Sequence, residues 1–127
     1  MKYAALTFVA LVALLHFYIA WFEIFAWTTK GPEVFSSFPA ELFEPTVVMA
    51  ANQGIYNAFL AAGLTWSLVI RNEEWQSNVA MCFLIFVAVA GVFGAATASP
   101  RILMVQTLPA VIGLILLVLS RRSSNAE

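Results

Sequence analysis

Two ionisable residues, His16 and Glu23, interrupt the apolar stretch that begins close to the N-terminus. They are seven positions apart, so in an α-helix they lie nearly two turns apart on one face. Ionisable groups inside a membrane segment are costly, and they usually face a protein interior where they bind ligands or move protons. Glu23 is therefore the candidate proton-accepting group and His16 its candidate partner. These two are the candidate catalytic residues.

A second apolar stretch carries four polar residues, Asn52, Gln53, Tyr56 and Asn57. Asn52 and Tyr56 are four positions apart, as are Gln53 and Asn57, so the four side chains form one stripe on a helix. Amide and phenol groups both donate and accept hydrogen bonds. We expect this stripe to orient a ligand or to hold the two ionisable groups.

Small residues form a ridge on roughly the opposite side of the same stretch: Ala50, Gly54, Ala58 and Ala62. A ridge of this kind lets two membrane helices approach closely. The third apolar stretch offers a matching ridge: Ala90, Gly94 and Ala98. We therefore expect the second stretch to sit centrally, with its polar side toward one neighbour and its small-residue side toward another.

These residues lie in four stretches, at about 3–27, 46–70, 77–97 and 102–119. Each is close to the ~20 apolar residues that a helix needs to cross a bilayer. Backbone polar groups must be satisfied within the segment in lipid, which favours helices. The sequence predicts an all-α protein, with residues 1–127 forming one domain of four transmembrane helices in up-down-up-down order.

The composition supports a membrane protein and excludes several other classes. The chain has 127 residues, of which 62% are hydrophobic and 10% charged, whereas soluble domains are about half apolar and a quarter charged. A formal net charge of -1 without a basic stripe argues against a nucleic-acid partner. One cysteine, Cys82, and one histidine are too few for a zinc or iron–sulfur site, so we expect no metal and no cofactor. We expect Cys82 to be buried.

Positive residues gather at one end of the predicted bundle: Lys2, Arg71, Arg121 and Arg122. The other end has only Lys30 and Arg101. Loops rich in Lys and Arg stay in the cytoplasm. We expect both termini to be cytoplasmic in a bacterial inner membrane, with segment 28–45 outside. The phenylalanines of that segment are expected to dip into lipid, and a cover over the site is the alternative.

Neighbouring helices alternate in direction, so depth in the membrane can be compared by counting about 1.5 Å per residue. Glu23 then lies level with the start of the polar stripe, and His16 with Tyr56 and Asn57. Gln106, in the fourth stretch, falls close to the level of Glu23. The sequence predicts one shared cavity that opens outward, with Gln106 among the ligand-binding residues.

Two motifs resemble a known family. They are H-x6-E, from His16 to Glu23, and A-N-Q-G-x-Y-N, from Ala51 to Asn57. Together they are similar to a family of small bacterial four-helix membrane proteins classed only as a domain of unknown function. The resemblance covers nearly the whole chain and implies the four-span architecture. It brings no activity, substrate or cofactor.

Several functions fit this pattern. We favour binding or transport of a small polar or amphipathic molecule, in which Glu23 exchanges a proton for the ligand, by a homo-oligomer surrounded by membrane lipids. A membrane enzyme acting on a lipid or quinone, with His16 and Glu23 as an acid–base pair, is an alternative. An accessory subunit of a larger complex is another, and a pair of His16 residues across a dimer could bind haem. The polar residues could also serve only as hydrogen bonds between helices.

Overall fold

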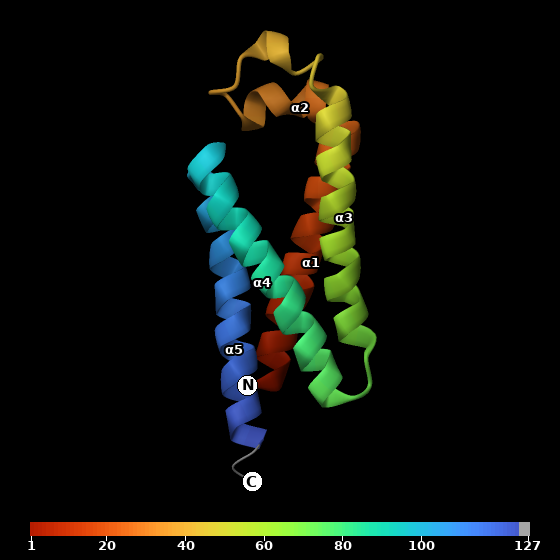
Figure 1. Cartoon of the computed structure of the whole chain (residues 1–127), viewed down its shortest axis with the longest axis vertical. Coiled ribbons are helices and arrows are strands. Elements are labelled where there is room, and N and C mark those ends of the chain that lie inside the picture. Colours follow the sequence, from red (N-terminus) through yellow and green to blue (C-terminus); the bar gives the residue numbers. More distant parts are fainter. Residues whose placement is uncertain (125–127) are drawn as a thin grey trace.

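The computed structural model describes residues 1–124, and in that range it contains helices and no strand (Figure 1). The elements in chain order are α1 (Lys2–Phe25), α2 (Trp27–Val34), the 3-10 helix η1 (Ala40–Leu42), α3 (Val47–Val69), α4 (Glu73–Thr97), the π-helical segment η2 (Leu103–Thr107) and α5 (Leu108–Ser124). This confirms the all-helical prediction. Four helices, with η2 and α5 taken as one, are long and apolar enough to cross a membrane. They indicate a multi-pass membrane protein.

Local side-chain contacts explain where the long helices begin and end. The side chain of Asn72 accepts a hydrogen bond from the backbone N–H of Trp75 at 2.9 Å and so caps the start of α4. Gln76, one turn later, donates to the carbonyls of Leu68 and Ile70 at 3.4 and 3.2 Å, which would otherwise end α3 without partners. The turn between α3 and α4 is therefore short and closed by its own polar groups.

The segment η2 is explained by Pro109. A proline lacks the N–H that would bond the carbonyl four residues earlier, so the helical ladder is interrupted there. The N–H of Leu108 instead donates to the carbonyl of Leu103, five residues back, which is the π-helical pattern. The hydroxyl of Thr107 donates to the Ala88 carbonyl at 3.4 Å and joins this irregular turn to α4.

Packing within the bundle is uneven. α1 and α3 share the most extensive contact, and α1 also packs on α5 while α4 packs on α3 and α5 (Figure 1). The core lies along one face of α1, where small residues allow the other helices to approach. Its buried residues are Ala5, Val9, Val12, Ala13, Leu64, Ala80, Leu84, Val87, Ala110 and Leu117.

The glycines show that the small-residue ridges pack differently from our expectation. A Cβ atom at Gly54 would lie 2.6 Å from Ile24 Cγ1 and 3.1 Å from the Ala20 carbonyl oxygen, so this part of the α3 ridge packs on α1. Gly94 of α4 faces Ile102, at the start of the fourth span. The predicted pairing of the two ridges was therefore wrong at these glycines, because each one accommodates a bulky β-branched side chain of a different helix.

The structure contradicts the expected burial of Cys82, and it packs Phe43, one of the phenylalanines expected to dip into lipid, inside the protein. Cys82 is exposed on the surface of the bundle and is not buried. The aromatic residues of the segment after α1 pack on one another. Phe43 is 2% exposed, and its ring centroid lies 5.0 Å from those of both Trp27 and Phe38. The indole N–H of Trp27 donates to the Thr46 hydroxyl at 3.0 Å, so this segment forms an aromatic cap over the ends of α1 and α3.

Candidate functional site

Glu23 and Asn57 form a polar link between α1 and α3. The amide Nδ2 of Asn57 donates to Glu23 Oε2 at 2.7 Å and makes a longer contact of 3.3 Å with the Gln53 carbonyl of its own helix. Glu23 is half-buried. Within residues 1–124 the ion pair found is that of Lys2 with Glu73, so no described cation neutralises Glu23. The link therefore places an ionisable group inside the membrane segment without an opposite charge beside it.

Gly54 lets α1 and α3 approach closely enough for the Glu23–Asn57 hydrogen bond to form. It lies one turn before Asn57 on the same side of α3, and a Cβ atom there would be 3.2 Å from Glu23 Cβ. A larger residue would push α1 away from α3. Gly54 of the A-N-Q-G-x-Y-N motif thus has a physical role. It lets the backbones of α1 and α3 approach closely, so that the short side chain of Asn57 reaches Glu23 on the neighbouring helix.

His16 lies nearer the middle of α1 than Glu23 does, and its side chain is buried. Its side chain is 0% exposed, and its Nδ1–H donates to the Val12 carbonyl at 2.8 Å, one turn back in α1. The other ring nitrogen, Nε2, has no described hydrogen-bond partner. Seven residues of helix separate it from Glu23 by ~10 Å along the axis. The structure does not bring the two predicted partners into contact.

The rest of the predicted polar stripe faces outward. Asn52 and Gln53 are exposed, and Tyr56 is 57% exposed with its ring packed edge-on to Phe59 at 6.3 Å. Only Asn57 turns toward α1. Gln106 is half-buried, and its Cβ lies close to Gly91 of α4. No hydrogen bond among the described residues joins Gln106 to Glu23 or to the stripe. Among the seven predicted residues, the described side-chain hydrogen bond between two helices is that of Asn57 with Glu23.

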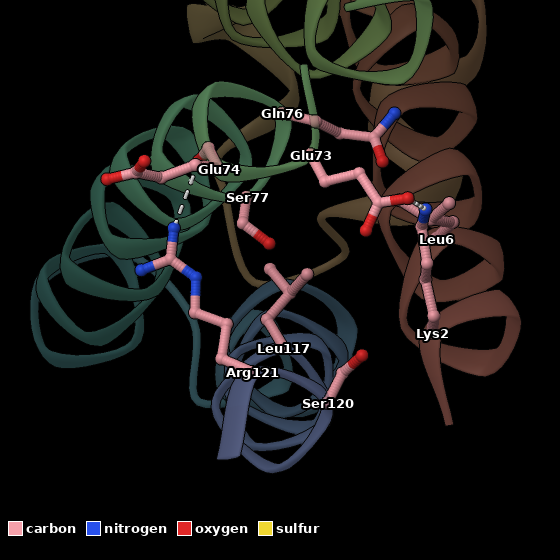
Figure 2. A pocket seen from close by; sticks show the side chains of 9 residues that line it. All are labelled: Lys2, Leu6, Glu73, Glu74, Gln76, Ser77, Leu117, Ser120 and Arg121. Atoms are coloured by element: carbon pink, nitrogen blue, oxygen red, sulfur yellow. Dashed lines mark hydrogen bonds and ion pairs between the residues drawn. The ribbon is translucent and has the colours of Figure 1, made fainter. Parts of the chain in front are cut away.

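A pocket of about 510 Å³ lies at the opposite end of the bundle, where α1 and α4 begin and α5 ends (Figure 2). We call it the terminal pocket. Its lining residues are Lys2, Leu6, Glu73, Glu74, Gln76, Ser77, Leu117, Ser120 and Arg121. The sequence indicated this pocket only indirectly, since Lys2 and Arg121 had served to orient the chain. The available signal was that charged or hydroxyl residues gather at the start of α1, the start of α4 and the end of α5, with Leu6 and Leu117 beside them.

Charges in the terminal pocket are only partly paired. Lys2 Nζ donates to Glu73 Oε1 at 2.7 Å, between side chains that are 42% and 72% exposed. An ion pair as exposed as this contributes roughly 0–1 kcal/mol. Arg121 donates to the Glu74 backbone carbonyl at 3.1 Å and to the Asn78 side-chain oxygen, both of which are neutral. The Glu74 carboxylate points away from the other lining groups (Figure 2). Arg121 therefore keeps an uncompensated charge beside the pocket.

Comparison with known proteins adds a family but no activity. The chain is similar over residues 10–118 to the family model described as "Protein of unknown function (DUF1304)". It is also 32% identical over 107 residues to the "Uncharacterized protein YpaA" of Lactococcus lactis subsp. lactis (strain IL1403), a match that covers 83% of this chain and 88% of that protein. No solved structure matches it. These matches confirm the resemblance carried by the H-x6-E and A-N-Q-G-x-Y-N motifs, and the chain belongs to the DUF1304 family of proteins of unknown function.

Proposed function

We propose that this protein binds a small amphipathic cation at Glu23, between α1 and α3, and exchanges it for a proton. The observation that carries the proposal is the half-buried Glu23 carboxyl, which has an amide partner in Asn57 and no described cation beside it. A carboxylate in this setting is costly in a membrane. Either a proton or a cationic ligand removes that cost, and the two therefore compete for the same oxygen atoms.

The exposed side of α3 supports a route to Glu23 from within the membrane. Gln53 and Tyr56 lie on the surface of α3 next to Asn57, and both are exposed. Tyr56 and Phe59 offer aromatic rings, which attract cations through their faces. A ligand with an apolar body and one positive charge could approach along this side and reach the carboxyl without crossing the buried core.

The same exposed groups support a homo-oligomer. Amide groups that face lipid lack hydrogen-bond partners, and each unsatisfied group is costly there. Asn52 and Gln53 can both donate and accept, so a second copy could satisfy them and close the outer side of the site. The homo-oligomer is part of this proposal.

The distribution of positive residues supports an orientation for the site. Lys2, Arg71, Arg121 and Arg122 lie at the end of the bundle where α1 begins, α3 turns into α4 and the described part of α5 ends. We propose that this end is cytoplasmic in a bacterial inner membrane, which places Glu23 nearer the outer face. A fluorescent protein fused to the C-terminus should fold and fluoresce in cells, whereas a dark fusion of equal abundance would reverse the orientation.

The acid–base alternative receives less support from the geometry. A substrate cannot reach His16 while its side chain is 0% exposed. The haem alternative meets the same obstacle, because an axial histidine must present a ring nitrogen at the protein surface or at a subunit interface. A purely structural role is favoured by one observation, the Glu23–Asn57 hydrogen bond itself. The experiment below separates this role from ligand binding.

The test is equilibrium binding of radiolabelled tetraphenylphosphonium, an amphipathic cation, to the full chain in nanodiscs of neutral lipid. We expect saturable binding that weakens as the pH is lowered, because protonation removes the charge of the carboxylate. Glu23→Gln should weaken binding at least about tenfold, the loss of one charge-assisted contact. Glu33→Gln, at an exposed carboxyl outside the spans, is the matched control and should bind like the wild type.

The outcomes that contradict the proposal are distinct. Cation binding at Glu23 is refuted if the wild-type protein shows no saturable binding, or if Glu23→Gln binds tetraphenylphosphonium as well as the wild type. If Glu23→Gln lowers the melting temperature in detergent and leaves tetraphenylphosphonium binding intact, the hydrogen bond to Asn57 is structural only.

A further inference from the structure

We propose that the terminal pocket binds the headgroup of a zwitterionic aminophospholipid, with the phosphate on Arg121 and the ammonium on Glu73. The pocket is remote from Glu23, because α1 begins beside the pocket and Glu23 lies near the opposite end of that helix (Figure 1). The inference is therefore independent of the proposed function.

The form of the pocket suits a lipid at the edge of the membrane. Its volume of about 510 Å³ lies within the range of about 300–1,000 Å³ that small-molecule sites occupy. Leu6 and Leu117 contribute apolar side chains from α1 and α5, and Figure 2 shows Leu117 pointing between the polar groups. Basic pockets between membrane helices near the membrane surface bind the headgroups of anionic lipids, and this pocket occupies the same kind of position. A headgroup seated here would leave its acyl chains beside α1 and α5.

The charges select the type of headgroup. Lys2 is paired with Glu73 and the Glu74 carboxylate points away, which leaves Arg121 as an uncompensated cation and the second Glu73 oxygen as a free acceptor. A purely anionic headgroup would also meet the Glu73 carboxylate, which extends from α4 toward Lys2 (Figure 2). A zwitterion has a complementary group for each sign. An uncompensated guanidinium and a free carboxylate oxygen on the same lining therefore favour a molecule that carries both a phosphate and an amine.

Arg121 is placed to hold the phosphate. Its present acceptors, the Glu74 carbonyl and the Asn78 amide oxygen, are neutral and are both engaged through Nη2. A guanidinium has five N–H donors, so donors and charge remain for a phosphate oxygen. The hydroxyls of Ser77 and Ser120 lie on the same lining and make no hydrogen bond with another described residue. They can donate to the remaining phosphate oxygens.

Glu73 is placed to hold the amine. One of its oxygens accepts from Lys2 at 2.7 Å, and its side chain is 72% exposed. The second oxygen can accept from a ligand ammonium while the ion pair stays intact. This contact needs an N–H donor, so a primary amine fits and a quaternary amine does not. A free phosphoethanolamine shares this chemistry, and the two leucines are what favour the lipid over the soluble compound.

The test is native mass spectrometry of the delipidated full chain in detergent with three lipids of identical acyl chains. We expect phosphatidylethanolamine to bind at least about tenfold more tightly than phosphatidylglycerol or phosphatidylcholine, the effect of one charge-assisted hydrogen bond. Arg121→Ala should weaken phosphatidylethanolamine binding about tenfold. Arg122→Ala, the exposed neighbour outside the lining, is the matched control and should bind like the wild type.

A second variant tests the selectivity without removing Arg121. Glu73→Gln should abolish the preference for phosphatidylethanolamine over phosphatidylcholine, and its folding is checked by the melting temperature. Preferred binding of phosphatidylglycerol, equal binding of the three lipids, or full binding to Arg121→Ala would overturn the inference. Displacement of the lipid by an equal concentration of free phosphoethanolamine would overturn the lipid as the source of the headgroup.

Discussion

The two helix pairs of this bundle have the same apolar character and are held together by different contacts. α1 and α3 meet through Gly54 and the hydrogen bond that Asn57 donates to Glu23 at 2.7 Å. α4 and the fourth span meet through Gly91, Gly94 and a longer hydroxyl bond of 3.4 Å. The exposed face of α4 is apolar, with Phe86, Val89, Val92 and Phe93 among its exposed residues.

This difference separates two roles within one small bundle. The exposed side chains along the middle of α4 are mostly hydrocarbon and aromatic, so lipid alone can cover this part of the helix. α3 exposes Asn52, Gln53 and Tyr56 instead, and lipid cannot satisfy their hydrogen-bonding groups. We therefore expect cation binding on the α1–α3 side, apart from the proposed headgroup site in the terminal pocket, and substitutions on the α1–α3 side should show how specialised it is.

The largest effect is expected from Gly54→Leu. A Cβ atom at this position already overlaps Ile24, so leucine must force α1 and α3 apart and break the Glu23–Asn57 bond. We expect a loss of about 3 kcal/mol in the free energy of unfolding, at the upper end of the usual cost of overpacking. Denaturant unfolding in detergent measures it. Ala62→Leu, at an exposed position of the same small-residue ridge, is the control, and an equal loss there would show that Gly54 is not special.

An intermediate effect is expected from Asn57→Leu. The change removes the amide that bonds Glu23 and leaves the carboxyl without its described partner. Interhelical hydrogen bonds in membranes contribute ~0.6–2 kcal/mol, and we expect a loss of that size in the same unfolding assay. Asn52→Leu, on the exposed part of the stripe, should not destabilise the monomer. A larger loss for Asn52→Leu than for Asn57→Leu would refute the assignment of Asn57 as the link.

The smallest effect is expected from His16→Leu. The variant keeps most of the buried volume and removes Nε2, a polar atom with no described partner. Replacing an unsatisfied buried group by an apolar one is nearly neutral or stabilising, so the free energy of unfolding should change by less than about 1 kcal/mol. His16→Ala should cost more, because it leaves a cavity. A folded His16→Leu protein that no longer binds tetraphenylphosphonium would assign His16 a function that its burial argues against.

The helical architecture follows from composition and length. The four apolar stretches are long enough to cross a bilayer as helices, and the structure is all-helical over the residues it describes. Glu23 and Asn57 could be named from the sequence, because ionisable and amide residues are conspicuous in apolar surroundings. Their contact could not, because counting depth from the helix ends ignores small differences in helix length and tilt, and it placed Asn57 level with His16. The burial of His16 and the exposure of Tyr56 could not be predicted either, since each lies on a helical face whose neighbours the sequence does not give.

The amino-acid sequence by itself determined that this chain forms apolar helices and which polar residues lie on each helical face, because hydropathy and the helical period are local properties. Only the tertiary structure decided that Glu23 contacts Asn57 and that the rest of the stripe faces outward. It also decided that the start of α1, the start of α4 and the end of α5 line one charged pocket. Those contacts depend on how helices rotate and approach one another. Rotation and approach are set by many packed side chains together, of which Gly54 against Ile24 is the clearest.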